Sequence, residues 1–310
     1  MKYNGNVFGK DAEISIEKEG IRLGERFLDY SEVSKLIPSN HRVRIDTLSG
    51  ELIEVSMLGF SYDGFWDELI GCFAKRSLES LFVDEEQIML CEGEYMLPDE
   101  SGRGLIALYP DSVCVLPQTF NAVRIPLCFT ERLWLDGYLF HILMQSGVEY
   151  VVGRMGYDTT PFAERAIKAA ELVKEQRCGA LKEITAAEPF TEKGLFRTKH
   201  PEQYWNAVFG NGVCAVELFA GEDAATYLYR FSEDREVFLA KLNLAMEATG
   251  THREVIYMTD EQLAANPLYL MTVLRTPAVR FLRERSDGRL IHNKNHREKL
   301  ERYIQQGKLS

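Results

Sequence analysis

SGELIEVSMLGFSYDGFWDEL (residues 49–69) and SGVEYVVGRMGYDTTPFAERA (residues 146–166) are two stretches of this 310-residue chain that align without a gap. The offset is 97 residues, and extending the alignment back to Val33 gives seven identities in 37 positions. The identical pairs are Leu36/Leu133, Ile45/Ile142, Ser49/Ser146, Gly50/Gly147, Val55/Val152, Gly59/Gly156 and Phe65/Phe162. They fall on a turn, a strand and the start of a helix, which are positions that a shared backbone fixes. The first half of the chain is therefore predicted to contain two copies of one structural unit.

Each copy has the apolar–polar alternation of half-buried strands, followed by the periodicity of an amphipathic helix. In the first copy, strands are expected at residues 14–16, 21–23, 28–36, 43–47 and 52–57, with a helix over 63–79. In the second copy, strands are expected at residues 105–109, 113–116, 125–134, 138–144 and 148–155, with a helix over 160–177. Phe65 and Phe162 are expected to be buried at equivalent points, where each helix meets its sheet.

This order of five strands and a closing helix resembles the small pleckstrin-homology-like (PH-like) domains of bacteria. The resemblance rests on LDYSEV (residues 28–33), VRIDTLSG (residues 43–50) and the helix in the first copy, and on IPL (residues 125–127) and SG (residues 146–147) in the second. It implies a bent antiparallel sheet closed by one C-terminal helix, over about half of the chain. Some family members bind phosphoinositides through basic loops, and many bind proteins. Residues 46–50 and 144–147 contain no basic residue, which departs from the lipid-binding pattern.

Two polar stretches predict the domain limits. Residues 84–101 hold seven acids and no Lys or Arg, and residues 181–193 are polar and contain Pro189. The expected fold class is α+β, with two PH-like units followed by a C-terminal α+β domain. The expected limits are residues 1–82 and 98–178 for the PH-like units, and residues 190–310 for a C-terminal domain that ends in a basic helical tail.

The C-terminal part begins with a pattern that repeats the earlier order of hairpin and helix. Strands are expected at residues 213–219 and 225–231, and a helix over 233–248 places Phe238 where Phe65 and Phe162 stand. This raises the hypothesis of a third, degenerate copy. The residues that follow predict strands at 254–258 and 289–292 and a last helix at 295–306. Between the strands, the helix signals are a capping box at Thr259–Gln262, helix starts at Pro267 and Pro277, and a helix stop at Gly288.

Composition is that of a soluble globular protein, with 45% hydrophobic and 27% charged residues. It excludes a disordered chain, a collagen-like repeat and a disulfide miniprotein. The start MKYNGNVFGK lacks the apolar region of a secretory signal, and none of the six cysteines forms a C-x-x-C pair. Reduced thiols in a cytoplasmic protein are therefore expected, with no metal and no cofactor.

Charge is unevenly distributed along the chain. Residues 272–310 carry a net charge of +6, although the whole chain has −11. The basic residues that could form a ligand-binding patch are Arg275, Arg280, Arg283, Arg285, Arg289, Lys294 and Arg297. Such a patch attracts anions such as lipid headgroups or nucleic acid, but a chain of net −11 is repelled from polyanions at long range. The competing interpretation is that these side chains pack against the acidic remainder of the same chain.

No catalytic motif is recognised, so no catalytic residue is predicted. The leading hypothesis is a non-enzymatic intracellular binding or scaffold protein, whose partner is a protein or peptide held at a sheet edge or in a groove between units. One alternative is a binder of anionic surfaces through the basic C-terminal segment. Another is an enzyme whose site lies in residues 190–310. The sequence leaves the oligomeric state undetermined.

Overall fold

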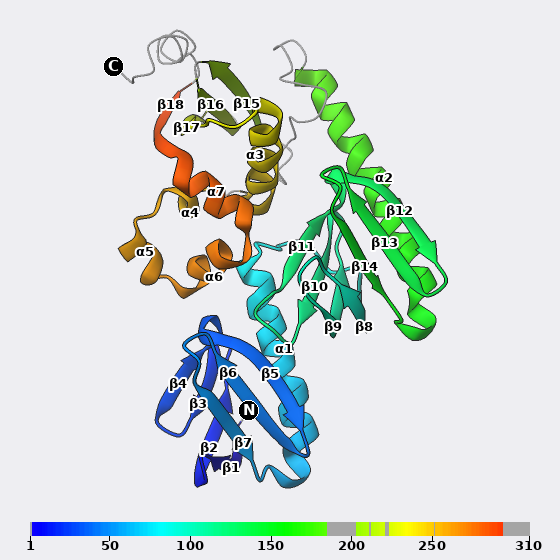
Figure 1. The fold of residues 1–310 in the computed structure, drawn as a ribbon, viewed down its shortest axis with the longest axis vertical. Coiled ribbons are helices and arrows are strands. Elements are labelled where there is room, and N and C mark those ends of the chain that lie inside the picture. Colours follow the sequence, from blue (N-terminus) through cyan, green and yellow to red (C-terminus); the bar gives the residue numbers. More distant parts are fainter. Residues whose placement is uncertain (1, 185–202, 211, 221–222, 251, 294–310) are drawn as a thin grey trace. The chain divides into compact units, whose positions relative to one another are not determined.

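The structure of the protein, a computed structural model, describes residues 2–184, 203–210, 212–220, 223–250 and 252–293 (Figure 1). Its contacts divide the chain into two compact units. The N-terminal unit consists of Met1–Ala170 together with Ala264–Arg275, and the C-terminal unit consists of Glu171–Leu263 together with Thr276–Ser310. A short segment from late in the sequence therefore belongs to the unit formed by the first half of the chain.

The first copy is a seven-stranded antiparallel sheet followed by a helix. Its strands are β1 (Lys2–Val7), β2 (Lys10–Ile16), β3 (Gly20–Leu23), β4 (Arg26–Asp29), β5 (Val33–Ser39), β6 (Arg42–Thr47) and β7 (Leu52–Ser56). They lie in the order β4-β3-β2-β1-β7-β6-β5, so β1 joins a four-stranded meander to a three-stranded one. Helix α1 (Tyr62–Ser80) follows and buries Phe65, Leu69 and Phe73 in the same core as the sheet.

The second copy repeats this arrangement. Its strands are β8 (Met89–Met96), β9 (Ser101–Leu108), β10 (Ser112–Pro117), β11 (Val123–Pro126), β12 (Thr130–Asp136), β13 (Leu139–Met144) and β14 (Glu149–Gly153). Their order, β11-β10-β9-β8-β14-β13-β12, is that of the first sheet. Helix α2 (Thr159–Ile184) closes the copy. The architecture of this half is therefore two sheets of one order, each followed by a helix.

The predicted offset of 97 residues is reproduced in detail by the two sheets. It relates the bounds of β4 to those of β11, of β5 to β12, of β6 to β13 and of β7 to β14. Both edge strands β5 and β12 carry a register irregularity at the same place, between Val33 and Lys35 and between Thr130 and Arg132. Phe65 and Phe162 are both fully buried, as predicted. These agreements are what an internal repeat requires.

Two expected strands are each interrupted. Residues 28–36 form β4 and β5 with a 3-10 turn at Tyr30–Glu32 between them, and residues 125–134 are split in the same way at Leu127–Phe129. In the first copy Asp29 causes the break, because its carboxylate accepts a hydrogen bond from the Ser31 N–H at 2.8 Å. The Asp29 N–H in turn donates to Glu32 Oε1 at 3.2 Å, which completes a capping box.

The sequence predicts no strand at residues 2–7, and within residues 84–101 it predicts from the apolar groups at 88–90 and 95–97 a strand added at the sheet edge. Strand β8 lies inside the polar stretch 84–101 and before residue 98, where the second PH-like unit is expected to begin. It pairs with β9 on one side and with β14 on the other, so it is a central strand of the second sheet. Strand β1 has the same place in the first sheet, between β2 and β7.

Gly5 and Gly93 occupy equivalent points in these two central strands. A Cβ at Gly93 would lie 2.7 Å from the Gly153 carbonyl oxygen, and a Cβ at Gly5 would lie 3.0 Å from the Ser56 carbonyl oxygen. Ser56 and Gly153 are themselves related by the offset of 97. Glycine therefore permits the first and last strands of each copy to approach closely.

Gly93→Ala is expected to lower the free energy of unfolding by about 1–3 kcal/mol, because the added methyl group overpacks the contact with Gly153. Gly5→Ala should have a smaller effect, since the contact there is longer. Urea denaturation followed by circular dichroism measures both. Gly71→Ala is the control, because a Cβ at this helical position meets no atom within 4 Å. Equal stabilities for Gly93→Ala and Gly71→Ala would contradict the expected overpacking.

Helix α1 contributes to two cores. Its first half packs on the first sheet, whereas Ala74 and Leu78 near its end pack with Ala107 and Cys114 of the second sheet. Helix α6 (Pro267–Arg275) also belongs to this N-terminal unit and contacts α1. The Thr272 hydroxyl donates to the Ser80 carbonyl oxygen at 2.6 Å, at the end of α1.

The C-terminal unit contains a four-stranded antiparallel sheet and short helices. The strands are β15 (Gln203–Gly210), β16 (Val213–Ala220), β17 (Asp223–Arg230) and β18 (Ser286–Asn293), in that order. The helices are α3 (Arg235–Thr249), α4 (Glu254–Tyr257), α5 (Asp260–Ala264, whose last residue is counted in the N-terminal unit) and α7 (Pro277–Arg285). Phe238 of α3 is fully buried and stacks on Phe231.

This sheet differs from the two seven-stranded sheets in strand number and order, so the described residues do not form a third copy of that arrangement. The predicted hairpin of β16 and β17, the helix ending at Gly250 and the capping box at Thr259 and Gln262 are confirmed. The strand expected at residues 254–258 is wrong, because residues 254–257 form α4. Gly288 does not end a helix but lies within β18. The helix expected at 295–306 lies outside the described residues.

Candidate functional site

Strand β5 forms one edge of the first sheet, and an extended segment of the second copy pairs with it. The Leu36 N–H donates to the Gln118 carbonyl oxygen at 2.8 Å, and the Phe120 N–H donates to the Ser34 carbonyl oxygen at 2.8 Å. Between these bonds, Lys35 and Thr119 face each other in an antiparallel bridge. Residues 118–122 connect β10 to β11, whereas only Gly24 and Glu25 connect the equivalent β3 and β4. The longer connection of the second copy thus covers the edge of the first.

Glu100 fixes this segment from inside the second copy. Its carboxylate accepts hydrogen bonds from the Tyr95 hydroxyl at 2.7 Å, the Thr119 hydroxyl at 2.9 Å and the Asn121 amide at 2.5 Å. Burial opposes ionisation of Glu100, but these hydrogen bonds and the charge of Lys35 outweigh it and hold its pKa below the ordinary value. The covering segment is therefore held by an ionised carboxylate.

The rest of the β5 edge is protected by Pro38. Residues at alternate positions of a strand present their backbone groups to the same side, so Pro38 follows Ser34 and Leu36 on the outer side. Proline has no N–H to offer there, and natural sheets use it to block further pairing. The first sheet therefore has a covered and blocked edge.

Strand β12 is the equivalent edge of the second sheet, and it has neither protection. The offset of 97 places Glu131, Leu133 and Leu135 where Ser34, Leu36 and Pro38 stand. Strand β12 is the last of its sheet, and no described segment pairs with its outer side. Leu133 is half-buried, whereas Leu36 is 1% exposed. The outer side of β12 thus offers backbone groups for pairing with a further strand, namely the N–H groups of Leu133 and Leu135 and the carbonyl of Glu131.

The outer face of the second sheet also differs from that of the first. In the first copy, Arg42 and Glu54 form a cross-strand ion pair of 3.0 Å, and both side chains are exposed. The offset places the apolar residues Leu139 and Val151 at these positions. They help to line an open cavity of about 350 Å³, together with Met96 of β8. Two apolar residues in the wall of a cavity thus replace the Arg42–Glu54 ion pair of the first copy, and the ion-paired Glu94 and Arg154 also line that cavity.

An aromatic and cationic stack joins this face to the open edge. The Arg132 guanidinium lies over the Trp134 ring at 4.9 Å, and Trp134 stacks on His141 with ring centroids 4.7 Å apart. His141 Nδ1 lies 2.7 Å from Glu149 Oε1. Its Nε2 is buried and has no hydrogen-bond partner within the described part of the chain. In β13, His141 alternates with the buried Phe140 and Ile142 and therefore lies on the outer face of the sheet.

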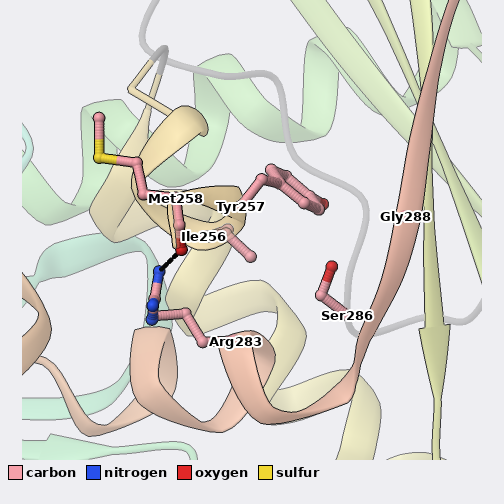
Figure 2. A pocket seen from close by; sticks show the side chains of 6 residues that line it. All are labelled: Ile256, Tyr257, Met258, Arg283, Ser286 and Gly288. Atoms are coloured by element: carbon pink, nitrogen blue, oxygen red, sulfur yellow. Dashed lines mark hydrogen bonds between the residues drawn. The ribbon is translucent and has the colours of Figure 1, made fainter. Parts of the chain in front are cut away.

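A second cavity, of about 450 Å³, lies in the C-terminal unit (Figure 2). It is lined by Ile256, Tyr257, Met258, Arg283, Ser286 and Gly288. The Tyr257 hydroxyl lies 2.6 Å from that of Tyr229, and burial followed by the charge of Tyr229 raises the pKa of Tyr257. Its hydroxyl therefore stays protonated. Arg283 is occupied in the wall, because its Nη1 donates to the Val255 and Met258 carbonyl oxygens at 2.8 and 2.9 Å.

The described residues of the predicted basic patch lie on three elements. Arg275 belongs to α6 in the N-terminal unit, whereas Arg280, Arg283 and Arg285 lie on α7 and Arg289 on β18. Arg285 donates to Glu233 Oε1 at 3.0 Å and lies over the Phe281 ring at 3.8 Å. Arg280 is exposed. Lys294 and Arg297 lie outside the described residues.

No protein-family model and no curated protein matches this chain. Among the described residues, no helix combines the length and the apolar character needed to cross a membrane. In the same residues, no three His, Cys, Asp or Glu side chains are grouped as metal ligands would be.

Proposed function

We propose that the protein is a non-enzymatic binding or scaffold protein, which captures an extended segment of a partner protein along β12. The two copies act as PH-like units in this proposal, and their support is the repeated order of seven strands with a following helix. The second copy supplies the binding edge, and the first copy with its covered edge is the structural support.

A single comparison carries the proposal. The same edge exists twice in the chain, and in the first copy an extended segment already pairs with it. The equivalent β12 edge has unpaired outward backbone groups within the described residues, and a Leu in place of Pro38. Exposed edges pair readily with other chains, and folded proteins normally protect them unless they serve for binding. Main-chain hydrogen bonds then supply affinity, and side chains at alternate positions supply specificity.

Leu135→Pro is expected to abolish binding at the edge without unfolding the protein. The substitution places in β12 the residue that β5 carries at the equivalent position, so the backbone accommodates it. It removes the Leu135 N–H from the outer side of the strand. Peptides can be selected on the full-length protein from a phage-displayed library of random 12-residue sequences. The selected peptides should lose most of their binding signal when wild type is replaced by Leu135→Pro.

Leu135→Ala is the matched control, because it removes the side chain but keeps the N–H. Binders that need the edge should retain most of their affinity for it. Hydrogen exchange provides a second readout, since a bound peptide should slow exchange of the Leu133 and Leu135 amides. Selected peptides that bind wild type and Leu135→Pro equally well would refute binding at the β12 edge.

The arginine-rich segment supports an anionic-surface binder less well. Arg283 and Arg285 donate to groups of the same unit, and so does Arg275 in the N-terminal unit. Binding a polyanion through these side chains would require those contacts to be broken. No observation at the cavity of the C-terminal unit points to a reaction.

A further inference from the structure

We infer that the segment captured by β12 carries an acidic side chain opposite Arg132 and an apolar side chain two residues before it, opposite Trp134. This inference rests on the proposed function, because it names the chemistry of the partner at that same edge. The juxtaposition that carries it is the pairing of residues 118–120 with β5, transferred to β12 by the offset of 97.

The internal pairing fixes the register and direction of the captured segment. Thr119 faces Lys35, and the hydrogen bonds of Leu36 and Ser34 join the residues on either side of that pair. Lys35 corresponds to Arg132, so a central residue of the partner faces Arg132. Its predecessor accepts a bond from the Leu133 N–H, and its successor donates to the Glu131 carbonyl. Because the pairing is antiparallel, the residue two positions earlier faces Trp134.

The positive charge of Arg132 determines which kind of partner residue fits opposite it. In the internal pairing a carboxylate lies at this point, because Glu100 accepts the Thr119 hydrogen bond and feels the charge of Lys35. At β12 the cation is again present as Arg132, which is exposed and held over the Trp134 ring. Among the described residues, no carboxylate forms an ion pair with Arg132 in the way that Glu100 lies near Lys35. The partner must therefore bring the carboxylate itself, and opposite charges directly across two strands stabilise the pairing.

Shape and polarity determine the earlier position. Pro117 precedes Thr119 by two positions and pairs with Gly104 at the end of β10, and continuing the register of the Lys35–Thr119 bridge by two residues leads to Ile37. Trp134 replaces Ile37 in the second copy, so a larger aromatic side chain, stacked with Arg132 and His141, lies at this position. Leu143 and His141 flank it on β13 in the register of the sheet. An apolar partner side chain packs on this surface, whereas a charged one would lose its hydration there.

The probe for this inference is taken from the chain itself. A synthetic peptide with the sequence of residues 115–123, VLPQTFNAV, contains the segment that pairs with β5. Its Thr119→Glu and Thr119→Lys versions differ only at the position opposite Arg132. Fluorescence anisotropy with the full-length protein should give about fivefold tighter binding for the Glu version than for the Lys version. A Pro117→Asp version of the Glu peptide should bind more weakly than its parent.

Arg132→Glu in the protein tests the same pair from the other side. Arg132 is exposed, so the variant should fold normally, and the preference should reverse in favour of the Lys peptide. Equal affinities of the Glu and Lys peptides, together with their loss on Leu135→Pro, would refute the inference and leave the proposed function standing. If neither peptide binds, the transferred register is wrong. If the random library also yields no edge-dependent binder, the proposed function fails as well.

Discussion

Replacing Phe65 or Phe162 with alanine is expected to lower the free energy of unfolding by about 3–5 kcal/mol in each case. Both rings are fully buried where the helix of each copy meets its sheet. Phe65 meets the Tyr3 ring edge-on with centroids 5.1 Å apart, and Phe162 meets Phe140 at 6.3 Å. Truncation removes these contacts and leaves a cavity that the sheet cannot fill. Urea denaturation of each variant, followed by circular dichroism, measures the loss.

The repeat itself supplies the control for this experiment. Phe60 and Tyr157 are also related by the offset of 97, but both are fully exposed in the turns before α1 and α2. Alanine at either position should change the free energy of unfolding by no more than about 0.5 kcal/mol. A cost below about 1 kcal/mol for both buried phenylalanines would show that the helices do not close the two cores as described.

Arg275→Ala is expected to lower the free energy of unfolding of the N-terminal unit by about 3 kcal/mol. The guanidinium donates from Nε to the Phe120 carbonyl oxygen at 2.7 Å and from Nη1 to the Ser80 hydroxyl at 2.6 Å. It also lies over the Phe120 ring at 4.4 Å. Hydrogen bonds from a charged donor contribute about 1.5–3 kcal/mol each, and their loss outweighs the cost of burying the cation. Burial of the cation also lowers the pKa of Arg275 to about 9.

Urea denaturation and hydrogen exchange of residues 267–275 measure this effect. Arg275→Lys should recover little, because an ammonium group cannot reach both acceptors and stack on the ring at once. Arg42→Ala is the matched control, since its ion pair with Glu54 is exposed and contributes about 0–1 kcal/mol. Unchanged exchange in α6 after Arg275→Ala would mean that other contacts hold this helix.

The sequence predicts the second part of each copy better than the first. From Val33 onward the alignment has no gap, so strands and helix are recognised in both copies together. Before that point the copies differ by longer β8–β9 and β10–β11 connections, and the alignment loses its register. Gly5 and Gly93 are equivalent, but their separation in the sequence differs from the 97 residues that separate Phe65 from Phe162. No single offset therefore aligns both pairs. Lys2–Val7 also has no clear apolar alternation, so β1 gives no signal by itself.

The sequence predicts a strand where the short helix α4 forms, because Val255 and Ile256 favour extended structure. Tertiary contacts override that preference. Arg283, 28 residues later in the sequence, donates to the carbonyl oxygen of Val255 and fixes the helical turn. A contact of this kind follows from packing between distant segments, and local residue patterns do not contain it.

Some features of the β12 edge can be predicted from the sequence. Once the copies are aligned, Pro38 stands opposite Leu135, and the pair Arg42 and Glu54 stands opposite Leu139 and Val151. These exchanges mark the second copy as the one with an unprotected, more apolar surface. The covering of β5 by residues 118–120 cannot be derived in that way, because it depends on how the two sheets pack. Without it, the sequence shows which copy has the less protected edge but not that the other edge is already paired.

The docking of α6 onto α1 has a consequence for how the protein is made. Thr272 bonds to Ser80 across 192 residues of chain. At a synthesis rate of roughly 5–20 residues per second, the ribosome adds α6 about 10–40 s after the end of α1 has been made. During that interval Ser80 and Phe120 lack their late partner. A nascent or shortened chain that stops before residue 267 therefore carries both sheets but lacks the helix that completes their unit.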